Sequence, residues 1–399
     1  MELSKFPRMV TRYRLELSNS NPPCVFDDCL NYVSYILSIS NHQICFLELH
    51  NLNLEKLHLS ITEVIPQYRV DINNGLSDIY QDGPMSLTQP VGYVLRGGGK
   101  RLRPLLTIFS AEACGGSKED VFSAALAVEV LHNFTLVHDD IMDQDYIRHG
   151  QETVHHKWDD GIAILTGDAM LSLALDLLNQ SPLAQQSQMK IFIEGLLAVC
   201  EGQALDKEFE TQEIVTLDDY IRMIDLKTGH MVGLAAELGA ISAGVDSETC
   251  QAIRDYGRLV GRAFQIQDDY LEIFSNSSNM GKSLESDIIL GKKTFLMIQA
   301  LQKNGSIMNS ALKTARTDFE KGIGQIRDYL ENEGIKETTQ KEIDTILKLA
   351  DEKINGLPID KDKLLYFSEL IKKRGHLKTV IVIGSINIIH PNNINIGNL

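Results

Sequence analysis

A long apolar run in the first half of the chain is the feature that most limits its fold. Between Ala124 and Val137 there is no glycine or proline, and the polar residues are only Glu129, His132, Asn133 and Thr135. Because the run is longer than a buried strand, it predicts a helix that packs against neighbours on most of its sides. Such a helix needs a large helical core around it.

Three carboxylates follow this run, at Asp139, Asp140 and Asp143. On a helix, Asp139 and Asp143 share one face, where like charges repel by ~0.2–0.5 kcal/mol per pair. The arrangement is unfavourable unless a cation lies between the acids, and hard oxygen ligands of this kind suit Mg²⁺. The alternative is that paired aspartates are simply frequent in an acidic protein.

The chain itself tests that alternative, because Asp-Asp occurs five times, beginning at Asp27, Asp139, Asp159, Asp218 and Asp268. Only the pairs at Asp139 and Asp268 have another acid four residues after their first member, and both end apolar helical runs. The second cluster consists of Asp268, Asp269 and Glu272. We therefore expect the two acid clusters to form two walls of one metal site.

Charge and composition exclude several classes of protein. The chain has 399 residues, of which 43% are hydrophobic and 23% charged, a profile typical of soluble globular proteins. Its net charge of −16 argues against nucleic acid and anionic membranes as general partners. Six cysteines without a C-x₂-C pattern indicate neither a disulfide scaffold nor a zinc site. We expect a cytoplasmic protein without a nucleic-acid partner or a transmembrane segment.

The expected organisation is one large domain behind an N-terminal extension. Residues 1–60 contain no pattern to which a function can be assigned. From about Ile61, glycine and proline fall mostly between the periodic runs, and no alternating strand pattern appears before the tail. The sequence thus predicts an all-α domain over residues 61–378, followed by a C-terminal tail over residues 379–399. Helix-start signals support this prediction at Ser181-Pro182, Thr216-x-x-Asp219 and Asp246-Ser-Glu.

A glycine-rich basic segment, Arg96–Pro104, is the candidate phosphate site. Its three consecutive glycines let the backbone approach a ligand and expose N–H groups, and Lys100, Arg101 and Arg103 add three cations. Pro104 is expected to open the next helix. The alternative is a solvated basic turn, which this segment alone does not exclude.

Further cations lie close to the acid clusters in the sequence. Arg148 follows the first cluster and has a planar fork that suits phosphate oxygens. Lys227 and Thr228 lie at a glycine break in a helical region, and Lys282, Lys292 and Lys293 follow the second cluster. Each of them taken alone is compatible with a surface position. Their recurrence beside the acids favours a ring of diphosphate-binding cations around the metal site.

In this order, the segments resemble those of the trans-isoprenyl diphosphate synthases. The resemblance rests on GGGKRLRP, HDDIMD, KTG, FQIQDD and GK…SDI…GKKT, and it extends from about Ile61 to the mid-370s. It implies an all-α bundle around a deep cavity, usually in a homodimer. It also implies a trinuclear Mg²⁺ cluster that binds an allylic diphosphate between the two acid clusters.

The same resemblance assigns roles to individual residues. It implies a catalytic metal site whose ligands are Asp139, Asp143 and Asp268, supported by Asp140 and Asp269. It implies that the allylic diphosphate is held by Arg148, Lys227, Thr228, Gln265, Lys282 and Lys292, with Lys227 counted among the catalytic residues. Isopentenyl diphosphate is expected to be held by Lys100, Arg103 and His132.

Two positions depart from the family pattern. Glu272 stands where the family usually has a third aspartate, and this change keeps the charge. His149 stands where the family usually has a second arginine, and this change removes a fixed cation from the expected substrate-binding surface.

The reaction implied by the resemblance is a Mg²⁺-dependent, head-to-tail condensation. Isopentenyl diphosphate would add to dimethylallyl, geranyl or farnesyl diphosphate. Phe134 lies five residues before Asp139, ~7.5 Å along the helix at about 1.5 Å per residue, where it can form a floor under the growing chain. With the small Thr135 beside it, this pattern resembles family members that make geranylgeranyl diphosphate.

Other functions stay open at this point. Phe134 can also be an ordinary core residue, and the product can then be farnesyl or a longer polyprenyl diphosphate. A class I terpene cyclase, a head-to-head condensing enzyme and a non-catalytic subunit of a heteromeric synthase are the alternatives from other classes. Metal-dependent consumption of isopentenyl diphosphate would separate the first function from these three.

Overall fold

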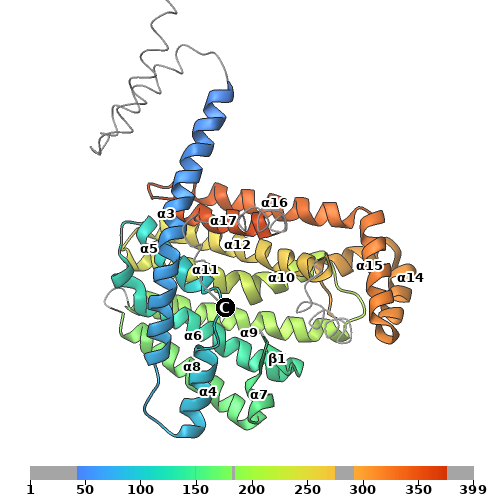
Figure 1. Ribbon diagram of the computed structural model, residues 1–399, viewed down its shortest axis with the longest axis horizontal. Helices are drawn as coiled ribbons and strands as arrows, with labels where there is room; N and C mark the ends of the chain where they lie inside the picture. Colours follow the sequence, from blue (N-terminus) through green and yellow to red (C-terminus); the bar gives the residue numbers. More distant parts are fainter. Residues whose placement is uncertain (1–42, 149, 182–184, 275–291, 375–399) are drawn as a thin grey trace, which may run out of the picture. The chain divides into compact units, whose positions relative to one another are not determined.

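The computed structural model describes residues 43–148, 150–181, 185–274 and 292–374, with side chains from residue 61 onward. The expected all-α fold is confirmed, since the described residues form helices apart from one short hairpin and the connecting loops (Figure 1). The first helices are α3 (Gln43–Asp78), α4 (Met85–Leu95), α5 (Leu102–Ala113) and α6 (Lys118–Asp143).

The hairpin separates these helices from the rest of the bundle. Its strands are β1 (Ile147–Arg148) and β2 (Gln151–Glu152), which pair antiparallel with Arg148 opposite Gln151. The helices after it are α7 (Val154–Lys157), α8 (Asp160–Asn179), α9 (Gln185–Thr211) and α10 (Leu217–Ile224). A π-helical turn, η2 (Asp225–Gly229), then leads to α11 (His230–Ser242) and α12 (Ser247–Phe274). The last helices are α14 (Phe295–Thr317), α15 (Phe319–Asn332), α16 (Ile335–Ile354) and α17 (Asp362–Arg374).

The chain divides into two units, Met1–Ser60 and Ile61–Leu399. The helix α3 contributes residues to both units, because it runs without interruption from Gln43 to Asp78. The site described below belongs entirely to the second unit.

The apolar run identified in the sequence lies within α6, at the centre of the second unit. A capping box starts this helix, because the Ser117 hydroxyl accepts a hydrogen bond from the Asp120 N–H while the Asp120 carboxylate accepts from Ser117. The helix packs against α5, α8 and α11. Its composition would suit a membrane span, but 67% of its most apolar window is buried inside the protein. Burying each valine or leucine contributes ~1.5–3 kcal/mol, so this contact surface fixes the direction in which the acid cluster projects.

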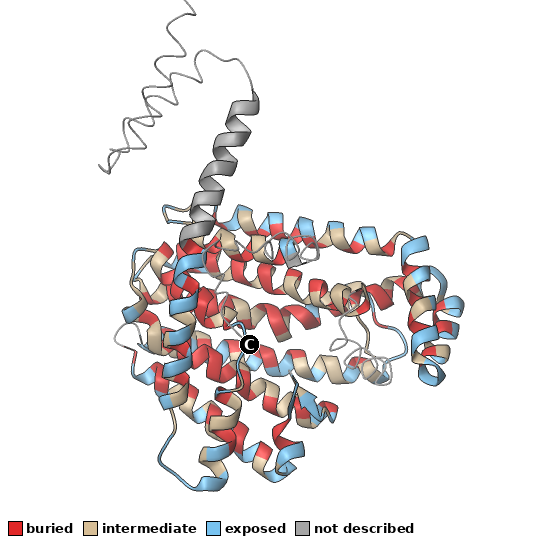
Figure 2. Cartoon of the chain, in the orientation of Figure 1, coloured by how far each residue is buried: buried red, intermediate tan, exposed pale blue. Residues whose placement is uncertain are grey.

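Close packing of α11 against α12 brings the second acid cluster to the same region. Gly261 makes this possible, since a Cβ atom there would lie 2.9 Å from the Gly229 Cα and 3.1 Å from the Thr228 carbonyl oxygen. The backbones of α12 and η2 therefore touch about two turns before Asp268. Figure 2 shows buried residues concentrated where these central helices meet.

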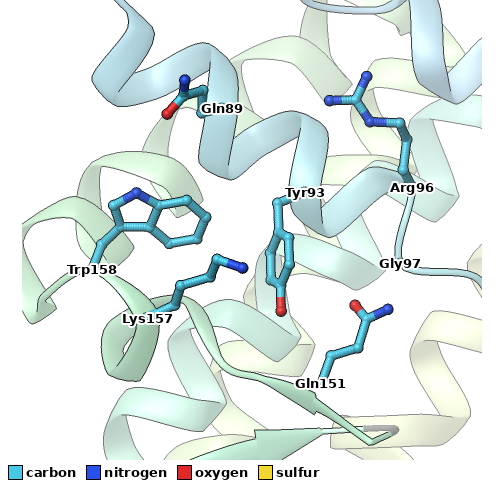
Figure 3. A pocket seen from close by; sticks show the side chains of 7 residues that line it. All are labelled: Gln89, Tyr93, Arg96, Gly97, Gln151, Lys157 and Trp158. Atoms are coloured by element: carbon cyan, nitrogen blue, oxygen red, sulfur yellow. The ribbon is translucent and has the colours of Figure 1, made fainter.

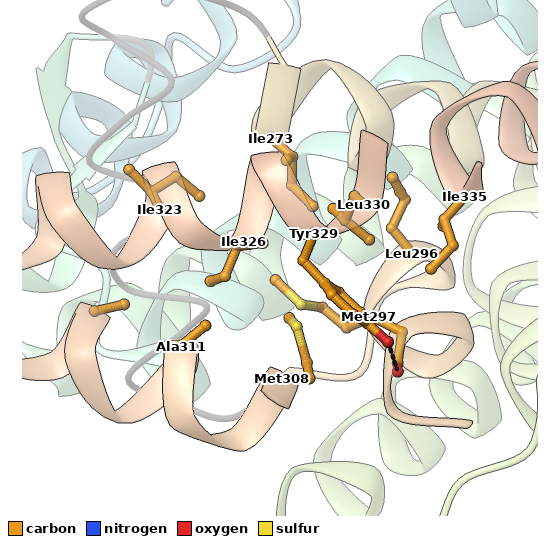
Figure 4. Packing of buried hydrophobic residues seen from close by; sticks show 12 residues of the cluster. Ile273, Leu296, Met297, Met308, Ala311, Ile323, Ile326, Tyr329, Leu330 and Ile335 are labelled. Carbon is orange, nitrogen blue, oxygen red and sulfur yellow. Dashed lines mark hydrogen bonds between the residues drawn. The ribbon is translucent and has the colours of Figure 1, made fainter. Parts of the chain in front are cut away.

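A separate apolar cluster holds the end of α12 against α14 and α15. It includes Ile273, Leu296, Met308, Ile326 and Leu330, which Figure 4 shows packed between these helices. Tyr329 also donates its hydroxyl hydrogen to the Ala300 carbonyl oxygen at 3.5 Å. This packing fixes the start of α14 next to the second acid cluster.

The helix-start predictions have mixed outcomes. The capping box at Thr216 and Asp219 is confirmed at the start of α10, and Asp246 accepts a hydrogen bond from the Thr249 N–H at the start of α12. Pro104 does not open α5, which begins two residues earlier at Leu102, although Pro104 still lies in the first turn. Pro182 lies outside the described residues.

Candidate active site

The first acid cluster lies at the end of α6, and each of its aspartates contacts different cationic side chains. The side chain of Asp139 is 17% exposed and lies 3.6 Å from the Lys227 ammonium, while its buried Oδ1 accepts no hydrogen bond among the described residues. Asp143 is only 3% exposed and pairs with Lys292 at 2.9 Å and Lys207 at 3.3 Å. Burial opposes the ionisation of Asp143, but these lysines outweigh it and lower its pKa.

Asp140 faces the hairpin instead. The Arg148 Nε donates to its carboxylate at 2.5 Å, and this places the guanidinium beside the first acid cluster, as the sequence predicted. Burial raises the pKa of Asp140 to about 6, although Arg148 favours the ionised form.

The second acid cluster lies on α12 and is bound to two other helices through Asp269. This carboxylate accepts hydrogen bonds from the Tyr220 hydroxyl at 2.6 Å, the Gln265 side-chain amide at 3.2 Å and the Phe295 N–H at 3.2 Å. Burial and the nearby carboxylates raise the pKa of Tyr220, so its hydroxyl stays a donor. Asp269 therefore joins α10, α12 and the start of α14, and its oxygens are engaged by the protein.

Thr228 and Gln265, which come from different segments of the sequence, meet beside this carboxylate. The Thr228 hydroxyl donates to Gln265 Oε1 at 3.0 Å. Both residues were expected to bind the allylic diphosphate, and the structure brings them into direct contact.

Lys227 lies on η2, and its ammonium faces Asp139 of the first acid cluster. Its ammonium contacts Asp206 at 2.6 Å as well as Asp139 at 3.6 Å. Gly202 of α9 allows this close approach, because a Cβ atom there would lie 2.3 Å from the Lys227 backbone nitrogen. The predicted glycine break at this point is wrong: the helix continues through a widened π-helical turn, a feature that is frequent at functional sites.

The sequence reasoning missed the contribution of α9. Asp206 and Lys207 point at Lys227 and Asp143 respectively, and Gln203, about one turn earlier, has both side-chain amide atoms buried without a hydrogen-bond partner among the described residues. They lie in a mixed charged stretch that looks like any solvent-exposed helix face. No local signal in the sequence distinguishes them.

The glycine-rich segment has the backbone conformations that its composition predicted. Gly98 and Gly99 have φ values of +82° and +130°, in the region that favours glycine. The Lys100 side chain is exposed, and its carbonyl oxygen accepts from Arg69 Nε at 3.0 Å. This segment therefore approaches the site as a fixed turn.

Arg101 is an exception to the expectation that three cations face a ligand. Its guanidinium is buried and donates to Glu129 at 2.7 Å, to Asn73 at 3.0 Å and to the Leu95 carbonyl oxygen at 2.8 Å. Because the left-handed backbone at Arg101 turns the side chain inward, only Lys100 and Arg103 remain as candidate phosphate ligands in this segment.

Arg103 points towards the second acid cluster. Its Nε is buried and has no hydrogen-bond partner among the described residues. Burial lowers the pKa of this arginine, while the carboxylates of Glu129 and Asp268 oppose that shift. A buried guanidinium edge with an unused donor fits an anionic ligand.

Of the remaining candidate substrate-binding residues, two lie on α6 and two lie outside the residues that the structure describes. His132 lies on α6 about two turns before the acids and is half-buried. Phe134 is 8% exposed, and its ring meets the His138 ring edge-on with centroids 4.8 Å apart. His149 and Lys282 lie outside the described residues.

The carboxylates fit magnesium by their chemistry, although they are not gathered as one preformed cluster. Among the described side chains, no three His, Cys, Asp or Glu residues are close enough to hold a metal. Asp139 and Asp143 instead face lysines, and Asp139 Oδ1, 3.6 Å from the Lys227 ammonium, is buried without a hydrogen bond among the described residues. Hard oxygen ligands next to phosphate-binding cations are the donor set that Mg²⁺ takes with a diphosphate.

A cavity of about 550 Å³ adjoins the second acid cluster. Asp269, Glu272 and Lys292 line its polar side, and Met297 and Leu301 line its apolar side. The deep cavity implied by the resemblance would run along α6, but the described lining of this cavity contains no residue of that helix.

A model of the family described as polyprenyl synthetase matches residues 84–330. The chain belongs to the polyprenyl synthetase family. The matched residues include the glycine-rich segment, both acid clusters and η2. The membership expected from the motifs is therefore confirmed.

Members with assigned products cover much of the chain. The geranylgeranyl diphosphate synthase of Methanosarcina mazei is 41% identical over 223 residues, 55% of this chain and 69% of that protein. The geranylfarnesyl diphosphate synthase of Natronomonas pharaonis is 35% identical and matches 60% of this chain and 76% of that protein. The structure of the geranylgeranyl pyrophosphate synthetase from Pyrococcus horikoshii matches with a TM-score of 0.73 at 31% identity, over 80% of this chain and 99% of that one.

Proposed function

We propose that this polyprenyl synthetase condenses isopentenyl diphosphate head-to-tail with an allylic diphosphate and that its product is geranylgeranyl diphosphate. The observation that carries this proposal is the position of Lys227, which contacts Asp139 and Asp206 from η2, a turn that packs against α12, the helix of Asp268. It supports one diphosphate site between two acid walls. The names of the relatives from Methanosarcina mazei and Pyrococcus horikoshii support the C20 product.

The cationic side chains would bind and orient the allylic diphosphate. We assign this role to Arg148, Lys227 and Lys292 by charge, and to Thr228 and Gln265 by hydrogen bonding. Each of these cations now contacts an acid of the first cluster or Asp206 and would exchange that contact for phosphate oxygens. Lys282 is proposed for the same ligand from the family pattern alone.

The metal would be held by Asp139, Asp143 and Asp268, in a trinuclear Mg²⁺ site. Bound Mg²⁺ supplies Lewis-acid stabilisation of the diphosphate leaving group as the allylic C–O bond breaks. Asp140 and Asp269 would position other residues and would not bind the metal themselves. Asp140 orients Arg148, and Asp269 holds Gln265 and the start of α14 in place.

Isopentenyl diphosphate would be held by Lys100, Arg103, His132 and His149. Its double bond attacks the allylic carbon, and the adduct then loses a proton to the released diphosphate, so the charges balance. The apolar surface of α6 excludes water from the carbocation. Phe134 is proposed as the floor that ends elongation at C20.

We also propose a homodimer that uses α8 and α9. Ile164 and Leu165 on α8 are 48% and 57% exposed, and Ile193 and Leu197 on α9 are 52% and 59% exposed. The two helices contact each other, and we propose that a second copy covers these exposed apolar side chains. Light scattering coupled to size-exclusion chromatography should give twice the chain mass, and Leu165→Glu combined with Leu197→Glu should give monomers.

The proposed function also implies the extent of the catalytic domain and the cellular location of the protein. We propose residues 61–378 as the catalytic domain, with residues 1–60 and 379–399 outside it, and a cytoplasmic location.

One assay tests the proposed reaction. Full-length protein is incubated with Mg²⁺, labelled isopentenyl diphosphate and dimethylallyl, geranyl or farnesyl diphosphate in turn, and product length is measured by chromatography. We expect consumption of isopentenyl diphosphate that chelation of Mg²⁺ abolishes, with a C20 product from each primer. Folded protein that consumes no isopentenyl diphosphate with any primer would overturn the proposal.

A further inference from the structure

A second basic cavity lies outside the candidate active site. It has a volume of about 400 Å³, within the usual range for small-ligand pockets, and Figure 3 shows the side chains around it. The lining residues are Gln89, Tyr93, Arg96, Gly97, Gln151, Lys157 and Trp158. Arg96 and Gly97 belong to the glycine-rich basic segment, but none of the seven is among the side chains assigned above to either substrate.

The charge of this cavity is opposite to that of the chain. Arg96 and Lys157 are both exposed, and neither forms an ion pair within the described part of the chain, while the described lining contains no carboxylate. The whole chain carries a net charge of −16, so a carboxylate-free cavity with two cations is a local exception. Such a cavity attracts anions.

Two aromatic rings define the rest of the cavity. The Tyr93 and Trp158 rings meet edge-on with centroids 5.4 Å apart. The Lys157 ammonium lies 4.2 Å from the Tyr93 centroid and 5.5 Å from a Trp158 ring, and Figure 3 shows it directed at Tyr93. Contact with the rings holds the ammonium at the cavity instead of leaving it extended in solvent. The rings also offer apolar surface to a ligand that carries a short hydrocarbon or planar group.

The walls of this cavity are continuous in sequence with two segments of the candidate active site. Gly97 begins the glycine-rich turn that leads to Lys100 and Arg103. Gln151 pairs across the hairpin with Arg148, which contacts Asp140 of the first acid cluster. A ligand that touches both Gly97 and Gln151 therefore contacts the glycine-rich turn and the hairpin at once.

We propose that this cavity, formed by Tyr93, Arg96, Lys157 and Trp158, is a second binding site for an organic diphosphate, separate from the catalytic site. Arg96 and Lys157 would neutralise the diphosphate, the amides of Gln89 and Gln151 would donate hydrogen bonds, and the rings would cover the organic group. Isopentenyl diphosphate has this chemistry. Binding here needs no metal, because the lining supplies the positive charge.

The single tryptophan of the chain makes the proposal directly measurable. Full-length protein is titrated with isopentenyl diphosphate, and separately with inorganic diphosphate, in the presence of a chelator while Trp158 emission is recorded. We expect a saturable change in emission and tighter binding of isopentenyl diphosphate. Lys157→Gln and Arg96→Gln should each weaken binding at least about tenfold, equivalent to about 1.4 kcal/mol.

Matched variants separate this site from others. Lys348→Gln removes the same charge from an exposed position on α16 and should leave the titration unchanged. Lys100→Gln weakens the binding proposed at the catalytic site, so the Trp158 signal that persists in this variant comes from the second site. Loss of the signal in Lys100→Gln but not in Lys157→Gln would overturn the proposal, as would the absence of saturable binding. Equal affinity for the two probes would overturn the role given to the rings. These outcomes do not depend on turnover, so they are distinct from a failure of the proposed reaction.

Discussion

Arg101 Nη1 donates a hydrogen bond to Glu129 Oε1 at 2.7 Å, and the two side chains are only 2% and 6% exposed. This pair fixes the glycine-rich turn to α6. Because Arg101 also donates to Asn73 on α3 and to the carbonyl oxygen that ends α4, one guanidinium joins four segments around the turn. One of the three cations that the sequence grouped as a candidate phosphate site is thus a structural one.

The Arg101 pair gives the first prediction. Arg101→Met should lower the free energy of unfolding by about 3–5 kcal/mol, because it leaves the Glu129 carboxylate buried without its partner. Arg101→Met combined with Glu129→Leu should recover most of that loss, since no unpaired charge remains. Urea denaturation measures both effects. Arg96→Met, which removes an exposed arginine, is the control and should change stability by less than about 0.5 kcal/mol.

The second prediction concerns the acid walls. Asp139→Ala and Asp268→Ala should each reduce turnover at least about 100-fold, equivalent to about 2.7 kcal/mol of transition-state stabilisation. Both variants should keep the helical circular dichroism of the parent chain. Asp218→Ala alters another Asp-Asp pair, on the exposed first turn of α10, and should leave turnover unchanged. Near-normal rates for Asp139→Ala at saturating Mg²⁺ would contradict the proposed metal site.

Product length provides the third prediction. Phe134→Ala should shift the products beyond C20, because it removes the ring proposed as the floor, while Thr135→Phe should shorten them. Chromatography of the products with farnesyl and geranyl diphosphate as primers measures the shift. Phe367→Ala removes a buried ring on α17 and controls for general loosening of the core. Identical product distributions in all four proteins would place the floor elsewhere.

A fourth prediction follows from Asp225 at the start of η2. Burial opposes its ionisation, but hydrogen bonds and charge from Arg262 and Arg258 outweigh burial and lower its pKa. A lowered pKa in the folded state gives stability that is present above the unfolded value, near 4, and is lost as the pH falls through the folded value.

Asp225→Asn should therefore destabilise the protein by about 3 kcal/mol at pH 7, because it leaves two arginines without their carboxylate. The difference between variant and parent should shrink below pH 4. Urea denaturation at pH 7 and at pH 3 measures both values. Asp344→Asn, at an exposed position on α16, should show no such dependence, and a constant difference for Asp225→Asn across this range would contradict the assigned ion pairs.

The sequence by itself determined the features that depend on local pattern. The apolar run predicted the buried helix α6, because helical periodicity and the absence of glycine and proline act over a few turns. The acid at the fourth position separated Asp139 and Asp268 from the other Asp-Asp pairs, since residues at that spacing share a helix face. The order of the motifs identified the family, which the comparison with known members confirms.

The tertiary structure alone decided which charged side chains meet. Asp206 contacts Lys227 only because Gly202 lets α9 and η2 touch. Arg101 turns inward only because Glu129, on the later helix α6, accepts its hydrogen bond. The widened turn at η2 likewise packs against both α9 and α12. These contacts join residues on different helices, and local periodicity carries no information about which faces of two helices will pack together.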